Sequence, residues 1–191
     1  MARPRSEDKQ QSLLRAATQT FASLGLGAPT AKIAKQAGVA EGTLFRYFPT
    51  KDALLGAVFE HLVEEMETAI TRGDDSTAPL KIRTQSLWER YIDWGIEHPD
   101  AYATINQLAV SGKLTSEQLD VATKLCSDIS CQSQRIIFPG LSVTQSAEFA
   151  DALMTAIANA TVGFAAAKPD SAAAYKSAGF DMVWKTLNQK D

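Results

Sequence analysis

Apolar residues recur every three or four positions along most of the chain, the spacing that gathers side chains on one face of an α-helix. In residues 8–24 the stripe includes Leu14, Phe21 and Leu24, and Gly25 then interrupts it. Glycine after the last periodic position is a common end of a helix. The pattern therefore predicts an amphipathic helix that ends before residue 25.

Similar periodicity continues to the end of the chain, and no stretch alternates as a β-strand would. Threonines at positions 30, 50 and 115 are placed to cap the helices that follow them. We expect an all-α fold of about nine helices. Their approximate ranges are 8–24, 31–37, 40–47, 50–72, 79–97, 100–111, 116–136, 144–167 and 170–188.

Composition favours a folded cytoplasmic protein. The 191 residues are 45% apolar, which is enough for a hydrophobic core. No uninterrupted apolar run approaches the roughly 20 residues of a membrane span, and the first residues lack the apolar segment of a secretory signal. The two cysteines, Cys126 and Cys131, point apart on one predicted helix, so we expect reduced packing residues.

Charge is distributed unevenly along the chain. Residues 1–55 carry eight Lys and Arg against four acids, whereas residues 56–191 carry eleven against eighteen. The net charges are +4 and −7, so the amino-terminal part is the better candidate for contact with a polyanion. An imbalance of this size also arises by chance, and charge alone does not decide the function.

The two short helices predicted at 31–37 and 40–47, around a turn at Gly38, have the layout of a helix-turn-helix. At about 100° per residue, Leu44 and Phe48 share one side of the second helix, which we expect to face the core. Gly42 and Arg46 lie on the opposite side. Glycine permits close approach to a sugar-phosphate wall, and a guanidinium can fork onto guanine or a phosphate.

Neighbouring positions extend this outward face. Thr43 and Phe45 flank it, Tyr47 lies at its rim, and Lys51 adds a charge at the start of the next helix. The negative charge of Glu41 argues against a phosphate-binding face. Glu41 could accept a hydrogen bond from a cytosine amino group, or it could simply interact favourably with the helix dipole. Structural alternatives remain, because an aromatic at this spacing can be core, an arginine can be solvated, and a glycine can merely serve the turn.

The run TAKIAKQAGVAEGTLFRYFPTKDALL resembles the helix-turn-helix of TetR-family transcriptional regulators, and the resemblance covers about residues 9–60. Three features depart from the usual pattern: Ala40 replaces a frequent Ser cap, Phe45 a frequent Tyr, and Arg46-Tyr47 an aromatic-His pair. The resemblance implies binding to double-stranded DNA. With Lys32 and Glu41 added, the predicted DNA-binding residues are Thr30, Lys32, Glu41, Gly42, Thr43, Phe45, Arg46, Tyr47 and Lys51.

The resemblance also implies a division into a helix-turn-helix domain, 1–52, and a helical regulatory domain, 53–191, that binds a small molecule and forms a homodimer. The Ala-rich segments 144–167 and 170–188 suit the dimer, although they could pack only within one subunit. Two modules related by a two-fold axis read a palindrome with recognition helices about 34–36 Å apart, or a small multiple of that.

Candidate effector-binding residues are aromatic and apolar side chains of the central helices, together with one amide, Asn106. They could equally form a solid core. If there is a pocket, it suits an apolar or aromatic compound with one or two hydrogen-bonding groups. The predicted ligand-binding residues are Trp88, Tyr91, Ile92, Trp94, Tyr102, Ile105, Asn106, Cys126, Ile129 and Phe164.

Nothing in the sequence favours catalysis, a cofactor or a metal. His98 lies at a predicted helix end, and His61, Glu64 and Glu65 fit a solvated helix face. Nucleotide-binding, hydrolase and zinc-protease motifs are not found. We expect a dimeric repressor released from a palindromic operator by a small effector. The alternatives are an activator or a helix-turn-helix regulator controlled by a protein partner.

Overall fold

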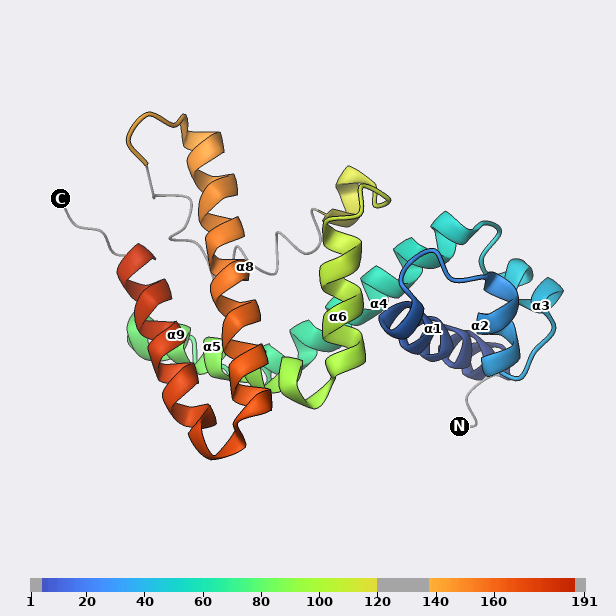
Figure 1. Cartoon of the computed structure of the whole chain (residues 1–191), viewed down its shortest axis with the longest axis horizontal. Helices are drawn as coiled ribbons and strands as arrows, with labels where there is room; N and C mark the ends of the chain where they lie inside the picture. The colour runs from blue at the N-terminus through green and yellow to red at the C-terminus, as the bar shows by residue number, and fades with distance from the viewer. Residues whose placement is uncertain (1–4, 120–137, 188–191) are drawn as a thin grey trace. The chain divides into compact units, whose positions relative to one another are not determined.

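The computed structural model describes residues 5–119 and 138–187, and every regular element in these ranges is helical (Figure 1). The all-α expectation is therefore confirmed. The helices are α1 (Arg5–Leu24), α2 (Thr30–Gln36), α3 (Glu41–Tyr47), α4 (Lys51–Thr71), α5 (Leu80–Glu97), α6 (Pro99–Ala109), α8 (Val143–Ala167), η2 (Pro169–Ser171) and α9 (Ala172–Leu187). The helix predicted at 116–136 lies mostly outside the described residues.

The chain forms two compact units, residues 1–66 with 98–123 and residues 67–97 with 124–191. These units differ from the predicted division at residues 52 and 53, because α6 packs on α1. Thr104 of α6 is fully buried, and its hydroxyl donates to the Thr18 carbonyl of α1 over 3.1 Å. The division at 52 and 53 stays a prediction about which part carries each function.

In the first unit, α1 supplies the surface on which α2 packs, and α2 in turn contacts α3. Phe21 and Ile33 are fully buried in this core. Thr20 donates to the Gln36 amide oxygen over 2.9 Å, and Gln36 donates to the Gln19 side chain over 2.7 Å. The turn between α2 and α3 needs Gly38, whose φ of 71° is unfavourable for a residue with a side chain. Packing and hydrogen bonds together fix α2 on α1.

The three predicted threonine caps have different outcomes. The Thr50 hydroxyl accepts from the Ala53 N–H over 3.0 Å, and the Thr115 hydroxyl accepts from the Gln118 N–H over 3.3 Å. Both caps are confirmed. The prediction for Thr30 is wrong: it is the first residue of α2, and Pro29 occupies the cap position without a side-chain bond. The Thr30 hydroxyl instead bonds a residue of α3.

In the second unit, α8 and α9 run side by side and both contact α5 (Figure 1). Trp88 of α5 is buried, and its indole N–H donates to the Lys176 carbonyl of α9 over 2.9 Å. Gly179 permits this approach, since a Cβ added there would lie 2.4 Å from the Thr161 hydroxyl and 2.8 Å from the Trp88 ring. Lys176 also forms an ion pair with Asp93. The three helices thus pack closely around Trp88.

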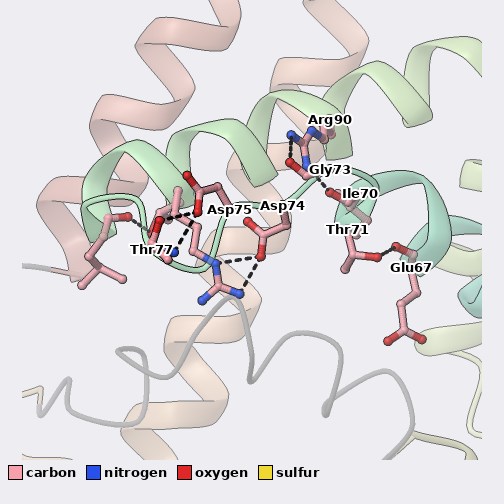
Figure 2. Close-up of polar contacts among 11 residues, drawn as sticks. Glu67, Ile70, Thr71, Gly73, Asp74, Asp75, Thr77 and Arg90 are labelled. Atoms are coloured by element: carbon pink, nitrogen blue, oxygen red, sulfur yellow. Dashed lines mark hydrogen bonds and ion pairs between the residues drawn. The ribbon is translucent and has the colours of Figure 1, made fainter.

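The connection from the end of α4 to α5 is held by side-chain bonds (Figure 2). Arg90 donates to the carbonyls of Ile70 and Gly73 over 3.0 and 3.4 Å. In the loop, Asp75 accepts from the Thr77 hydroxyl over 2.6 Å and from its N–H over 2.9 Å. These two bonds hold the pKa of Asp75 below its usual value, and the bond from the hydroxyl contributes more than the bond from the N–H. The last turn of α4 is therefore tied to α5.

Helix α8 differs from the other helices of the described chain in its apolar character. By length and composition alone it could cross a membrane, a test that the core helices of soluble proteins also pass. The sequence contains no uninterrupted apolar run of that length, because acids such as Glu148 and Asp151 interrupt α8. A helix with so many apolar side chains is stabilised when another surface covers them.

Candidate nucleic-acid interface

The short helix α3 has one buried side and one exposed side. Leu44 and Phe48 are buried, as the predicted rotation of the helix requires. On the other side, Gly42 and Arg46 are exposed, and Phe45 keeps 40% of its surface accessible. A Cβ added at Gly42 would meet nothing within 4 Å. Phe45 is therefore not a core residue, and Gly42, which lies inside α3 without a positive φ, is not required by the turn.

The remaining predicted DNA-binding residues are less uniform. Lys32 is exposed, and Thr43 is half-buried. Tyr47 is also half-buried, with its ring centroid 6.5 Å from that of Phe48. The half-buried Lys51 donates from Nζ to the Ala28 carbonyl over 2.8 Å. Lys51 thus joins the start of α4 to the loop before α2, a role that its position in the sequence did not predict.

Thr30 and Glu41, the first residues of α2 and α3, bond to each other. The Thr30 hydroxyl donates to Glu41 Oε1 over 2.6 Å, a short distance typical of a hydroxyl bonded to a carboxylate. Ala40, at the cap position of α3, supplies no side-chain bond, in agreement with its departure from the usual Ser. The beginnings of the two helices are therefore linked by side chains eleven positions apart.

The predicted effector-binding residues fall into both units. Trp88, Ile92 and Trp94 are buried in α5, whereas Tyr91 is half-buried. Trp88 already has a protein partner for its indole N–H. This burial and bonding favour a core role for that residue, one of the two alternatives that the sequence left open.

The other candidates are on α6 and α8. Tyr102 is buried, while Ile105 and Asn106 are half-buried, and Asn106 donates to the Tyr102 carbonyl of its own helix over 3.0 Å. Phe164 keeps 53% of its surface accessible and stacks on Tyr175 with ring centroids 5.4 Å apart. Cys126 and Ile129 lie outside the described residues. The proposed binding wall thus stays a prediction.

Helix α8 also has an exposed face, which begins at Phe149, whose ring contacts that of Phe138 with centroids 5.1 Å apart. Phe149 is 48% accessible, and Ala152, Ala156, Ala160 and Gly163 follow it at helical spacing, all exposed. A Cβ added at Gly163 would meet nothing within 4 Å. The predicted small-residue stripe thus faces outward from the unit and not toward α5.

Within the described ranges, no group of three or more His, Cys, Asp or Glu side chains is arranged to hold a metal ion. His61 lies 3.4 Å from Glu65, one helical turn along α4, and Glu64 is exposed. Glu64 and Glu65 thus fit the solvated face that the sequence predicts, whereas His61 keeps only 15% of its side chain accessible.

The helix-turn-helix geometry, with its outward α3 face, coincides with a family match. Residues 13–58 match the family described as bacterial regulatory proteins, tetR family. The chain therefore carries the helix-turn-helix domain of the TetR family. This is a family of transcriptional regulators and not of enzymes, which agrees with the expectation that the chain has no catalytic role.

Two curated relatives match this chain over part of their length. The HTH-type transcriptional regulator BetI of Stenotrophomonas maltophilia is 35% identical over 79 residues, which are 38% of this chain and 40% of that protein. An HTH-type transcriptional repressor of Mycobacterium tuberculosis is 40% identical over 82 residues, 42% of each chain. The matches thus span about two-fifths of these curated relatives.

Solved structures match over nearly the whole chain. A TetR family transcription regulator from Shewanella sp. PV-4 has a TM-score of 0.77 and 28% identity, covering 93% of this chain and 96% of that one. Below 25% identity the likeness concerns the fold. LfrR of Mycobacterium smegmatis, in complex with proflavine, has 21% identity, a TM-score of 0.59 and coverage of 95% and 96%. FadR of Bacillus subtilis, in complex with stearoyl-CoA, has 18% identity and a TM-score of 0.62, and the match covers 91% of this chain and 97% of that one.

Sequence reasoning missed the polar contacts that hold this interface in place: Thr20 and Gln19 on Gln36, Lys51 on Ala28, and Thr30 on Glu41. Only the polar character of these side chains was visible in the sequence. Their pairing depends on how α1, α2, α3 and α4 pack.

Proposed function

We propose that the chain is a cytoplasmic, homodimeric regulator that binds a palindromic DNA operator, represses transcription there, and is released by a small and mostly apolar effector. The observation that carries the DNA-binding part is the exposed face of α3. A helix with an accessible arginine and aromatic ring, and with a glycine facing open space, suits the major groove.

The chemistry of this face assigns roles to individual residues. Arg46 is exposed and can donate two parallel hydrogen bonds to a guanine or to a phosphate. Phe45 offers an apolar surface for a thymine methyl, and Gly42 lets the backbone approach the DNA closely. Thr43, Tyr47 and Lys32 are placed for contacts with the sugar-phosphate backbone.

The exposed stripe of α8 supports the homodimer. Phe149 and the small residues after it would be covered by the same face of a second chain, as a two-fold interface requires. Small side chains permit close approach of two helices. Two reading helices then contact two half-sites, which provides the specificity that one module lacks.

The effector is proposed from the chemical character of the residues that the sequence predicts to bind it and from the ligands of similar folds. Proflavine is a flat aromatic, and stearoyl-CoA carries a long acyl chain; these are the ligands of LfrR and FadR. The residues predicted from the present sequence are likewise mostly aromatic and aliphatic, and Asn106 is the amide among them. We therefore propose an apolar or aromatic effector with one or two polar groups.

Helix α4 is the proposed link between effector and DNA. Its first residue, Lys51, bonds the loop before α2, and its last turn accepts a hydrogen bond from Arg90 of α5. A displacement of α4 would therefore disturb contacts at both of its ends. A 100-fold loss of operator affinity needs about 2.7 kcal/mol of differential effector binding, within the usual range of coupling free energies.

The deciding experiment selects duplexes bound by the full-length protein from a random pool at a fixed salt concentration. A palindromic consensus with two half-sites is expected. Failure to enrich any sequence would contradict specific DNA binding, and a single unpaired half-site would contradict the dimer. Compounds of the acridine and acyl-CoA classes can then be tested for release of the selected duplex. If a compound binds and the affinity for the duplex is unchanged when the protein is saturated with it, control of DNA binding by that compound is excluded.

A further inference from the structure

The bond between Thr30 and Glu41 suggests a role that direct DNA contact does not explain. A hydroxyl has one proton to donate, and Thr30 gives it to Glu41 Oε1 at 2.6 Å. In the free protein, therefore, the Thr30 proton is not offered to a phosphate. The bond also holds one carboxylate oxygen in place on the exposed surface at the start of α3.

Glu41 is the only acid between residues 30 and 47. The other charged residues of α2 and α3 are Lys32, Lys35 and Arg46, all exposed. A carboxylate among these cations repels the phosphates of any duplex that approaches. The repulsion is offset only where the DNA presents a hydrogen-bond donor to Glu41, such as the amino group of a cytosine.

We propose that Glu41 is a specificity determinant, which weakens binding to DNA that lacks a matching donor, and that Thr30 is the residue that positions its carboxylate. This inference rests on the proposed DNA-binding function. Fixing the carboxylate matters because a free side chain could turn away from the DNA and avoid the repulsion. Selectivity would then arise from a cost imposed on wrong sequences as well as from favourable contacts.

The test compares the selected operator duplex with a scrambled duplex of equal length and composition, by fluorescence anisotropy at one salt concentration. Glu41→Gln removes the charge and keeps an amide oxygen. It should raise affinity for the scrambled duplex by about 3- to 10-fold and lower the ratio of operator to scrambled affinity. Glu64→Gln, the same change at an exposed position of α4, is the matched control and should change neither value.

Thr30 is tested by a pair of variants that leave the charge in place. Thr30→Val should lower the affinity ratio, while Thr30→Ser, which keeps the hydroxyl, should restore it. A general loss of structure would not be rescued in this way, and circular dichroism melting of each variant checks the fold.

The inference is overturned if Glu41→Gln leaves scrambled-duplex affinity unchanged, or if Glu64→Gln raises it equally. It is also overturned if Thr30→Val keeps the wild-type ratio. These results differ from a failure of the proposed function, in which the wild-type protein itself enriches no duplex from the pool.

Discussion

Two helices of this protein, α3 and α8, present an exposed face that contains a glycine with no intramolecular neighbour. Gly42 of α3 and Gly163 of α8 both lie inside a helix, where glycine costs about 1 kcal/mol relative to alanine. The faces differ in everything else. On α3 the glycine stands beside a guanidinium, a carboxylate and a phenyl ring, whereas on α8 it follows alanines and Phe149.

The contrast supports the proposal that the two faces have different partners, DNA for α3 and a second chain for α8. A charged, hydrogen-bonding face is suited to a polyanion with base edges to read, and it would be costly to bury against apolar protein. An apolar face of small residues is suited to another helix and offers a duplex nothing to bind. Gly179 provides the internal comparison, since its missing Cβ is explained by Thr161 and Trp88.

The largest effect is expected from a charge on the α8 face. Ala156→Arg would bury an unpaired guanidinium in the proposed dimer, so operator affinity should fall by at least about 100-fold together with dimerisation. Sedimentation velocity and anisotropy measure the two losses. The matched control is Ala109→Arg, at the exposed end of α6, which should leave both unchanged. A dimer that persists in Ala156→Arg would exclude this face as the interface.

Next in size is the loss of the arginine on the α3 face. Arg46→Ala should weaken operator binding by about 1–3 kcal/mol and, if Arg46 reads a guanine, relax preference at one position. Repeating the duplex selection with the variant shows which position changes. Arg72→Ala, an exposed arginine after α4, is the control. A uniform loss across all duplexes would instead assign Arg46 to the phosphates.

The same substitution should have different effects at the glycines of α8 and α9. Gly179→Ala forces a methyl against Trp88 and Thr161 and should lower the free energy of unfolding by about 1–3 kcal/mol, less the gain in helix propensity. In Gly163→Ala the added methyl meets no atom within the protomer, so the free energy of unfolding should not fall for this reason. The same methyl would lie in the proposed dimer interface and should weaken dimerisation. Denaturant unfolding at several protein concentrations separates the two effects. Equal destabilisation by both would remove the distinction between an internal and an external contact.

The smallest effect is expected at Gly42. Gly42→Ala has open space within the protein and should leave the melting temperature unchanged or slightly raised. If DNA approaches the backbone closely there, operator affinity should nevertheless fall, by up to about tenfold. Unchanged affinity would mean that the α3 face keeps its distance from the duplex at this position.

Much of the fold was predictable because hydrophobic spacing is a local property. The period of 3.6 residues located α1 to α6 and both Ala-rich helices, and it placed Leu44 inward and Arg46 outward. Errors occurred where periodicity gives no signal. Helix α1 begins at Arg5, before the apolar stripe, and Thr30 lies inside α2 although its sequence context resembles a cap.

The exposed face of the candidate site was predictable from the sequence, but the hydrogen bonds that hold it in place were not. Phe45 was assigned outward from helical rotation, and its exposure agrees. That Lys51 would reach the Ala28 carbonyl, or that Gln36 would bond Thr20 and Gln19, could not be inferred from spacing along one helix. Such bonds depend on the angle and distance at which separate helices pack.

The sequence by itself determined that the described chain is helical, which residues of α3 face inward, and that residues 13–58 carry the TetR-family helix-turn-helix. Tertiary structure alone decided which polar groups meet: Thr30 with Glu41 across eleven positions, and Thr104 with Thr18 across eighty-six. The physical reason is range. Helix formation and amphipathicity depend on neighbours within a turn or two, whereas a hydrogen bond between helices exists only once packing has brought its donor and acceptor together.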